Sequence, residues 1–591
     1  MRVNMAQVMH ANQSPRRTAL ARVRISFIRR CLFYCLRLLD PRWRQYPSAS
    51  YPRISYKQSA CHSCPLWSRA KKKALFLHHF RQSANVGTRR KLDIMSHIAI
   101  VKVRSAHDLE WNPSQRTKRL LGFLGKRDLL SRLKTTEGMP FMPQLTLPHI
   151  AALGEAYNQK HDAHHTFATI NQSEDGLDLS DYDVVLFTVS TSNALATYRV
   201  SDRLRARGIP TVMGGIHVSV FPDEAAEHAS TVVTGEAEEV IDYLLSDLAS
   251  EGALKPRYDG GRASSLDALP LPRWDGYSPW ILPVQTSRGC RNACHFCSTT
   301  RFQGGSRRHR PVMEIVSELY ALREQGVLND NTTVFFTDNN IVSDTDHRRG
   351  IRDVRYAKKL FKALIPLGIS WCGQGEIGVA EDPELVSLMA ESGAFLLLIG
   401  LETVEQENLH ALGKQSNTVS RYAEALDMLH SHGIANIGCF ITGLDRDTPD
   451  VFDATWRFIR RYVDVPQVSV LTPFPGTSLY KKFKIEGRLL HEDWSKYDVT
   501  HVVFRPNKMT PEELEDGYSR LVKKVFTSYA IWKRALRYAF TRPVNGGPAL
   551  SRFDKFTSIL ATNLIYRRLC TINRASALPN LATPQKNQMK P

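Results

Sequence analysis

From residue 281 to residue 505, short apolar runs alternate with amphipathic stretches along the chain. The amphipathic stretches, such as 382–392 and 418–432, repeat their apolar positions every three to four residues, which is the period of a helix. The apolar runs have the length of strands and cover residues 281–284, 332–336, 370–375, 395–399, 437–442 and 468–472. This alternation predicts six β/α units, with the strands in one parallel sheet and right-handed crossovers between them.

A second, smaller α/β pattern occupies residues 95–250. Strand-like runs at 98–103, 184–189, 211–214 and 231–234 alternate with helical patterns at 147–158, 195–207 and 237–249. This predicts an open, doubly wound, Rossmann-like sheet. Sheets of this kind bind ligands beyond the carboxyl ends of their strands, where the strand order reverses. The candidate contacts at those ends are Ser190, Gly214, Gly215, His217, Gly235 and Glu236.

Residues 251–280 join the two patterns. They are rich in Gly, Pro and Asp, so we expect them to form a linker. A linker of this length holds the two domains face to face, which would place the function in the cleft between them.

The net charge of +21 belongs almost entirely to residues 1–94, which hold 20 Lys or Arg and 2 Asp or Glu. The rest of the chain is close to neutral, so charge gives little support to a nucleic-acid partner. The segment 1–94 shows no helical or strand period. Its composition fits a transit peptide, a nucleic-acid- or membrane-binding arm, or a stretch upstream of the native start. We favour Met95 as the native start and expect 1–94 to be disordered, and Cys61 and Cys64 are one isolated pair that does not predict a metal site.

Three cysteines, Cys290, Cys294 and Cys297, follow the first strand of the six with the spacing C-x3-C-x2-C. Three thiolates hold three irons of a [4Fe–4S] cluster and leave the fourth iron open to another ligand. The alternative is a structural zinc site with His295 as fourth ligand, but such sites favour two C-x2-C pairs. Cysteines that bind iron must be reduced, which predicts a reducing compartment such as the cytoplasm.

With Phe296 before the third cysteine, this motif resembles that of the radical SAM superfamily. The resemblance implies a partial TIM barrel of six units over residues 281–505. It also implies that S-adenosylmethionine (SAM) binds the open iron and is cleaved by an electron from the cluster to a 5′-deoxyadenosyl radical. In such barrels the chemistry gathers at the carboxyl ends of the strands. The candidates at those ends are Asp338, Asn339, Gln374, Glu376, Glu402, Gly438, Gly443 and Thr472.

The resemblance also assigns roles to several of these residues. Asp338 and Asn339 would lie at the SAM amino group, and Glu402 would lie near the ribose. The run Gly438–Gly443 resembles the glycine motif of the fifth strand, along which the adenine lies. The Gly-Gly-Glu that usually follows the second strand is absent. Cys372 and Cys439 are expected to be small buried apolar residues.

The segments 210–217, 221–224 and 234–236 resemble the cobalamin-binding domain that precedes many radical SAM enzymes. The usual D-x-H-x-x-G motif, whose histidine binds cobalt, is missing. The string 162–167 lacks the glycine and precedes a strand, so His164 is not assigned as a ligand. Many domains of this combined family hold cobalamin without a protein imidazole, and His217 is expected at the edge of the pocket rather than on cobalt.

The tail, residues 506–591, is predicted to be helical. Thr510 and Glu513 form a capping box around Pro511 at the helix start. Residues 518–536 have the pattern of one basic amphipathic helix, which either covers the open side of the barrel or lies on a membrane surface. We expect disorder from residue 575 onward. No run of 18 apolar residues occurs, so no transmembrane helix is expected.

The combined architecture resembles cobalamin-dependent radical SAM enzymes, the class B methylases. This implies methylation of an unactivated carbon in a secondary metabolite, a lipid or a tetrapyrrole, with a small-molecule substrate and an electron donor such as flavodoxin or ferredoxin. Two alternatives remain open. One is an oxidative cyclisation or rearrangement without methyl transfer, and the other is a non-catalytic sensor that binds a corrinoid or an Fe–S cluster.

Overall fold

The computed structural model describes residues 95–105, 143–250, 254–275, 279–346, 351–541 and 551–570. Residues 93–591 form one compact unit. The predictions made for residues 1–94, for Cys61 and Cys64, and for the chain beyond 575 lie outside the described residues. The helices of the described part are too short or too polar to cross a bilayer.

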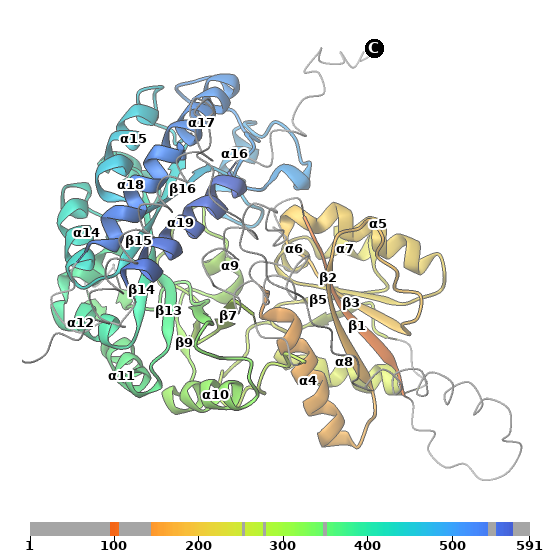
Figure 1. Ribbon diagram of the computed structural model, residues 1–591. Helices are drawn as coiled ribbons and strands as arrows, with labels where there is room; N and C mark the ends of the chain where they lie inside the picture. The colour runs from red at the N-terminus through yellow and green to blue at the C-terminus, as the bar shows by residue number, and fades with distance from the viewer. Residues whose placement is uncertain are drawn as a thin grey trace, which may run out of the picture. The chain divides into compact units, whose positions relative to one another are not determined.

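The first domain contains a parallel sheet of six strands in the order β2-β1-β3-β4-β5-β6. Helices cover both faces of this sheet, as the alternation of strands and helices predicted (Figure 1). The strands are β1 (His97–Val103), β2 (Thr166–Gln172), β3 (Val184–Thr188), β4 (Thr211–Gly214), β5 (Thr231–Thr234) and β6 (Arg257–Asp259). The helices are α4 (Thr146–His161) and α8 (Ile241–Ala249) on one face, and α5 (Ala194–Arg205), α6 (Ile216–Val220) and α7 (Pro222–His228) on the other.

The sequence did not predict two of these strands. β2 carries polar residues along its length and has only Phe167 fully buried, so it lacks an apolar run. β6 has three residues, of which only Tyr258 is buried, and it lies within the stretch 251–280 that was expected to be a linker. Both are the outermost strands of the sheet, where a strand gains little from apolar side chains.

The second domain contains the six predicted parallel strands, in the order β16-β15-β14-β13-β10-β7. They are β7 (Ile281–Val284), β10 (Thr333–Phe336), β13 (Ser370–Gly375), β14 (Ala394–Glu402), β15 (Ala435–Thr442) and β16 (Val465–Val470). The outer helices are α10 (Val312–Glu324), α11 (Arg355–Leu364), α12 (Pro383–Glu391), α14 (Tyr422–Ser431) and α15 (Val451–Tyr462) (Figure 1). The strand order follows the chain order, so the carboxyl ends of all six strands meet at one edge, where a barrel of this type places its chemistry.

The tail forms three helices, α17 (Pro511–Val525), α18 (Ser528–Ala539) and α19 (Arg552–Leu569). The capping box at Thr510 and Glu513 is confirmed. The prediction of one helix over 518–536 is wrong, because the chain turns after Val525 and Thr527 caps a new helix by accepting a hydrogen bond from the Ala530 amide at 3.2 Å.

Helices α18 and α19 pack against each other and against the inner face of the barrel sheet (Figure 1). Tyr538 of α18 donates from its hydroxyl towards the carbonyls of Phe395 and Gly433, at 3.0 and 2.8 Å. Cys372 is buried in the same apolar cluster, as predicted, and Cys439 is partly buried against it. The tail therefore covers the barrel, which was one of the two predicted positions for it.

Candidate active site

The three cysteines lie in the loop that follows β7, between the short strand β8 (Ser287–Arg288) and helix α9 (Thr299–Gln303). All three are free and partly exposed. Backbone hydrogen bonds hold the loop, from Cys297 to Cys294 and from Cys290 to Gly304, each 3.2 Å. Burial, aided by Glu402 and by the neighbouring thiols of Cys297 and Cys290, outweighs the positive charge of Lys414 and raises the pKa of the Cys294 thiol to about 12.

These cysteines fit a [4Fe–4S] cluster better than a single zinc ion. Within the described residues, no three His, Cys, Asp or Glu side chains converge as ligands of one metal ion. A four-iron cluster has no such requirement, since each cysteine binds a different iron. His295 hydrogen-bonds through its ring Nδ1 to the carbonyl of Ala411, at 3.1 Å, which fixes its ring against the loop after α13.

The loop of residues 289–298, which carries the three cysteines, is called the cluster loop below. Asp338 anchors the start of this loop. It follows β10, is completely buried, and accepts hydrogen bonds from the Thr286 amide at 3.0 Å, the Thr286 hydroxyl at 2.6 Å and the Ser287 hydroxyl. Asp338 was expected to contact the SAM amino group, but its carboxylate already accepts these three hydrogen bonds from Thr286 and Ser287. The neighbouring Asn339 hydrogen-bonds through its side-chain amide to Gln303 of α9, at 2.6 Å.

A second loop, after α13 (Gln406–Ala411), borders the cysteines from the side of β14. The amide of His295 donates to the Leu412 carbonyl at 3.0 Å. Gly413 has a φ of +73°, and a Cβ there would lie 3.1 Å from Nε2 of His295, so glycine suits this close approach. The contact brings the next residue, Lys414, to the cysteines.

Lys414 and Glu402 form a buried ion pair beside the cluster loop. Burial lowers the pKa of Lys414, but the negative charges of Glu402 and Cys294 outweigh burial and hold the pKa above its ordinary value. A Cβ on Gly400 would overlap both charged groups, which explains the glycine two residues before Glu402. The sequence analysis missed Lys414. The sequence feature that could have indicated it is the pair Gly413–Lys414, which comes shortly after the helix that follows β14.

The other residues of the barrel that the sequence suggested for SAM binding differ in what surrounds them. Gln374 lies at the end of β13, and Glu376 directly follows this strand. Glu376 is buried near Arg352, whose Nε lies 3.4 Å away. Thr472, after β16, is buried and donates to the Val470 carbonyl at 3.2 Å. Gly438 packs against Val463 and Phe440 on the side of the outer helices, so core packing explains its missing side chain.

Gly443 begins the loop after β15 and has a φ of +90°. Its amide and that of Leu444 both donate to Oδ2 of Asp447, at 2.9 Å each. Oδ1 of Asp447 accepts from the side-chain amide of Asn408 at 2.8 Å. Burial outweighs these hydrogen bonds and raises the pKa of Asp447 to about 7. A carboxyl whose pKa is raised by folding stabilises the fold below its unfolded pKa, and that stability is lost as the pH rises to about 7.

We therefore expect Asp447→Asn to flatten the pH dependence of stability between about pH 4 and pH 7. The new amide oxygen can accept from the two backbone amides. Oδ1 of Asn408 has no partner within the described residues, so a flip of that amide would satisfy the new NH2 group. Urea unfolding at pH 5 and pH 8 measures this. The wild-type protein should lose more stability on going to pH 8 than the variant, and equal losses would contradict the assignment.

The reversal of strand order in the first domain lies between β1 and β3, which places the ligand edge at their carboxyl ends. Ser190 follows β3, and its amide donates to Asn193 Oδ1 at 2.8 Å. A Cβ on Gly214 would meet Val233 at 3.6 Å, which is an ordinary van der Waals contact. Gly215 and Gly235 have φ values of +110° and +79°, in the left-handed region that favours glycine.

His217 does not lie at the edge of a pocket, contrary to the expectation from sequence. It lies in α6 and is 1% exposed, because the rings of Phe221 and Trp494 enclose it at centroid distances of 5.5 Å. Its Nε2 is 3.2 Å from Glu224, whereas Nδ1 has no partner within the described residues. A buried polar atom without a partner among the described residues, two residues after Gly215, fits a ligand bound there, and these residues are compatible with cobalamin.

Glu236 connects the two domains rather than facing an open edge. It is buried and accepts hydrogen bonds from Arg288 at 3.0 Å and from Arg308 at 2.5 and 2.9 Å. Arg288 also reaches Glu238 at 2.5 Å, and Glu238 pairs with His149 at 2.7 Å. Arg288 stands two residues before Cys290, so these ion pairs tie the cluster loop to the first domain. Burial opposes ionisation of Glu236, but the two arginines outweigh burial and hold its pKa below the ordinary value.

A second connection involves the chain after β16. Trp494 donates from its indole N–H to Glu224 of α7 at 3.1 Å, and the hydroxyl of Tyr198 donates to the same carboxylate at 3.0 Å. Tyr480, Trp494 and Tyr497 are buried in the core of the first domain. The residues 478–503 therefore pack onto the first domain, although they follow the barrel in sequence.

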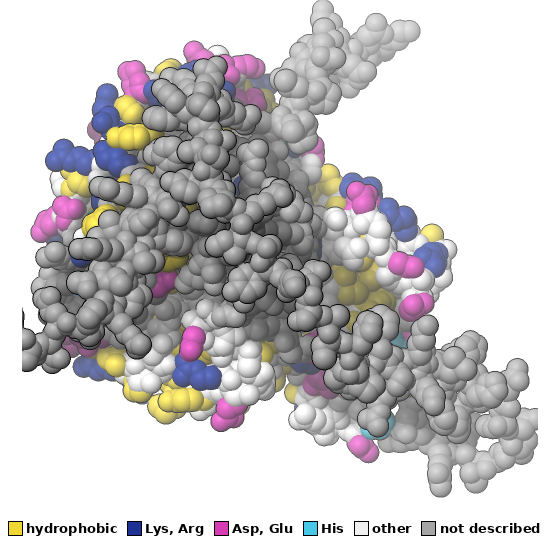
Figure 2. Space-filling model, in the orientation of Figure 1, with side chains coloured by type: hydrophobic (Ala, Val, Ile, Leu, Met, Phe, Trp, Pro, Cys, Tyr) yellow, Lys and Arg dark blue, Asp and Glu magenta, His cyan; other side chains and the backbone are white. Residues whose placement is uncertain are grey.

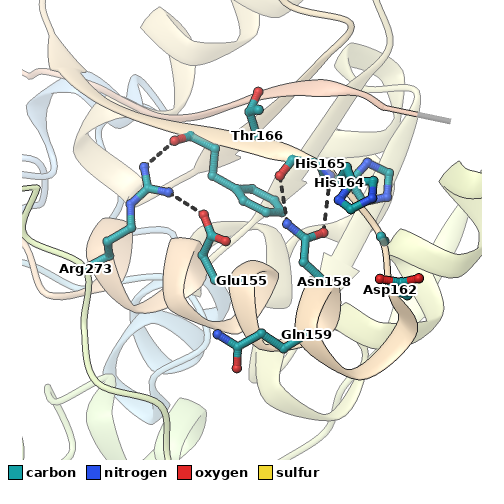
Figure 3. A pocket seen from close by; sticks show the side chains of 10 residues that line it. Glu155, Asn158, Gln159, Asp162, His164, His165, Thr166 and Arg273 are labelled. Carbon is teal, nitrogen blue, oxygen red and sulfur yellow. Dashed lines mark hydrogen bonds and ion pairs between the residues drawn. The ribbon is translucent and has the colours of Figure 1, made fainter. Parts of the chain in front are cut away.

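A pocket of about 590 Å³ lies on the first domain between the end of α4 and the start of β2. Figure 3 shows Arg273 reaching Glu155 at 2.8 Å, and Asn158 hydrogen-bonded to the main chain of His165. This pocket contains His164, but it lies at the amino end of β2, away from the carboxyl ends that bind ligands. It is not the cobalamin edge, which agrees with leaving His164 unassigned.

Three family models match the chain. The radical SAM superfamily matches residues 284–459, the B12 binding domain matches 141–245, and a domain of unknown function matches 477–563. The last of these includes the segment that packs onto the first domain and the helices that cover the barrel.

Several proteins of known name are similar in sequence. Bacteriochlorophyllide d C-12(1)-methyltransferase of Chlorobaculum tepidum is 33% identical over 60% of this chain and 77% of that protein. Bacteriochlorophyllide d C-8(2)-methyltransferase of the same organism is 30% identical over 61% of this chain and 81% of that protein. Hopanoid C-2 methylase of Rhodopseudomonas palustris is 26% identical over 48% and 54%.

Solved structures share the fold. The radical SAM methyltransferase TsrM of Kitasatospora setae, with cobalamin and a [4Fe–4S] cluster bound, has a TM-score of 0.51 at 13% identity over 80% of this chain and 99% of that chain. The cobalamin-dependent radical SAM enzyme OxsB, with aqua-cobalamin and SAM bound, has a TM-score of 0.53 at 13% identity over 80% and 72%. At these identities the likeness supports the fold alone.

Proposed function

Because this chain belongs to the radical SAM superfamily and carries a B12-binding domain, we propose that it methylates an unactivated carbon of a hydrophobic tetrapyrrole. Its cofactors are a [4Fe–4S] cluster, SAM and cobalamin. The observation that carries the proposal is the pairing of an open-iron cysteine motif with a cobalamin domain in a chain 33% and 30% identical to two bacteriochlorophyllide methyltransferases. In the reaction one C–H bond of the substrate breaks and one C–CH3 bond forms.

When bound, the cluster and SAM supply the radical that removes hydrogen, and cobalamin supplies the methyl group. The protein binds and orients these groups. Cys290, Cys294 and Cys297 hold the cluster, while Asp338 fixes their loop from β10. Glu236 fixes the same loop from the first domain through Arg288.

The proposed SAM contacts are the polar groups at the carboxyl edge of the barrel that borders the cysteines. They are Asn339, Gln374, Glu376, Glu402 and the backbone at Gly443. The proposed cobalamin contacts are Ser190, Gly214, Gly215 and Gly235 along the edge of the first sheet, with His217 beneath them. The reaction also needs a one-electron donor such as flavodoxin or ferredoxin, and the reduced cysteines favour the cytoplasm.

The decisive experiment is anaerobic reconstitution with iron, sulfide and hydroxocobalamin, followed by bacteriochlorophyllide d, a reductant and SAM with a deuterated methyl group. We expect 5′-deoxyadenosine, bound cobalamin in the visible spectrum, and a product that gains the labelled methyl. Omission of hydroxocobalamin should abolish methyl transfer. 5′-Deoxyadenosine with an oxidised, unlabelled product would instead support a cyclase, the activity named for a magnesium-protoporphyrin IX monomethyl ester cyclase of Cereibacter sphaeroides that is 25% identical over 54% of this chain and 56% of that protein.

A further inference from the structure

Helices α18 and α19 expose an unusual set of side chains. Most of the large apolar side chains of the described residues are buried, yet α18 exposes Tyr529 and Leu536, and its C-cap Phe540 is also exposed, with Tyr529 at 77% and Phe540 at 63%. Helix α19 adds Phe553 at 42% and Leu564 at 41%. Residues 529, 533, 536 and 540 recur every three to four positions, so on α18 they share one face of the helix.

The other side of this pair of helices is occupied. Ile531, Ala535 and Tyr538 of α18 and Ile559 of α19 are buried against the barrel. The exposed stripe is therefore not an incompletely packed core face. It faces away from the barrel, on helices already held in place by buried contacts such as the hydrogen bonds from Arg534 to Asn563, at 2.7 and 3.1 Å.

The charges interleaved with these apolar side chains are positive. Lys533 is exposed and shares this face of α18. The guanidinium of Arg552 lies over the ring of Phe540, 5.4 Å from its centroid, which joins the end of α18 to the start of α19. The acidic group at this end, Asp554, is hydrogen-bonded to Ser551 in the cap of α19. Figure 2 shows acidic and basic side chains mixed over the coloured part of the surface.

Exposed aromatic and aliphatic side chains combined with neighbouring cations match the interfacial region of a bilayer with anionic headgroups. The rings enter the boundary between headgroups and acyl chains, while Lys533 and Arg552 meet the phosphates. A protein partner would not require the cations to surround the rings. We propose that the exposed face of α18 and α19, defined by Tyr529, Lys533, Leu536, Phe540, Arg552 and Phe553, docks the enzyme on an anionic membrane surface. This inference does not depend on the proposed substrate.

The experiment must separate this face from the segment 1–94, whose 20 Lys or Arg against 2 Asp or Glu would also favour anionic lipid. Hydrogen–deuterium exchange of the full chain, with and without vesicles of equal phosphatidylglycerol and phosphatidylcholine, gives a signal for each segment. We expect slower exchange in peptides from 528–541 and 551–565, and no change in peptides from 478–490. The protection should survive salt high enough to screen the segment 1–94, because burial of apolar side chains is not screened.

The test variant is Leu536→Ser with Phe540→Ser, and the matched control is Ile485→Ser, which changes an 88% exposed apolar residue on α16 (Ser478–Ile485). The amount of protein that floats with the vesicles in high salt should fall at least about tenfold for the test variant and stay unchanged for the control. Equal flotation of the wild type, the test variant and the control would overturn the proposal. Vesicle-induced protection from exchange that is limited to the segment 1–94 would also overturn it. Protection without vesicles that grows with protein concentration would assign the face to a second copy instead.

Discussion

Cys294→Ala is expected to abolish 5′-deoxyadenosine formation, with a loss of at least about a hundredfold. Three cysteines are available for a four-iron cluster, and each holds one iron, so loss of one leaves two protein ligands. Substitution of residues that only support metal ligands already costs about 10- to 100-fold in affinity or activity, and loss of a ligand removes more. The measurements are iron and sulfide content after anaerobic reconstitution, the electron paramagnetic resonance signal of the reduced cluster, and 5′-deoxyadenosine by chromatography.

The matched control is Cys372→Ala, which removes a thiol from the same domain. Cys372 is buried among apolar side chains of the barrel interior and does not belong to the cluster loop. This variant should keep its iron, its resonance signal and its 5′-deoxyadenosine. A Cys294→Ala protein with a wild-type circular dichroism spectrum that still cleaves SAM would show that the cluster is bound elsewhere.

Glu236→Gln is expected to lower the free energy of unfolding by about 3–5 kcal/mol, because Arg308 loses its acidic partner while Arg288 keeps only Glu238, which leaves one buried positive charge uncompensated. The effect should extend to the cluster. Arg288 stands two residues before Cys290, so a shift of this arginine moves the loop that carries the iron ligands. We expect both a lower midpoint in urea and a lower iron content at equal protein concentration.

This variant separates two roles for Glu236. If the residue contacts cobalamin, as the sequence suggested, cobalamin retention falls while iron content and stability stay near the wild type. If it fixes the cluster loop, as its ion pairs indicate, iron content and stability fall together. The control is Glu174→Gln, which breaks pairs with Arg199 and Arg203 on the surface of the same domain. Exposed pairs contribute little to stability, so this control should change neither quantity appreciably.

Strands with an apolar run were visible in the sequence. All six barrel strands and four of the six strands of the first sheet were predicted close to their observed positions. β2 and β6 were missed because edge strands are held largely by backbone hydrogen bonds, which leave no apolar pattern. The break between α17 and α18 was missed for a related reason, since the amphipathic pattern continues through Phe526 and only the cap at Thr527 marks the turn.

The sequence by itself determined the cysteine motif, the two α/β domains and the strand ends that we propose as their ligand sites. These features are local, since each depends on spacing or periodicity within a few tens of residues. Tertiary structure alone decided how individual polar side chains are used. Asp338, Glu236 and Lys414 are paired with groups 52, 52 and 12 residues away in the chain, namely Thr286, Arg288 and Glu402. No periodic pattern encodes such partners, because burying a charge requires a partner in space and not in sequence.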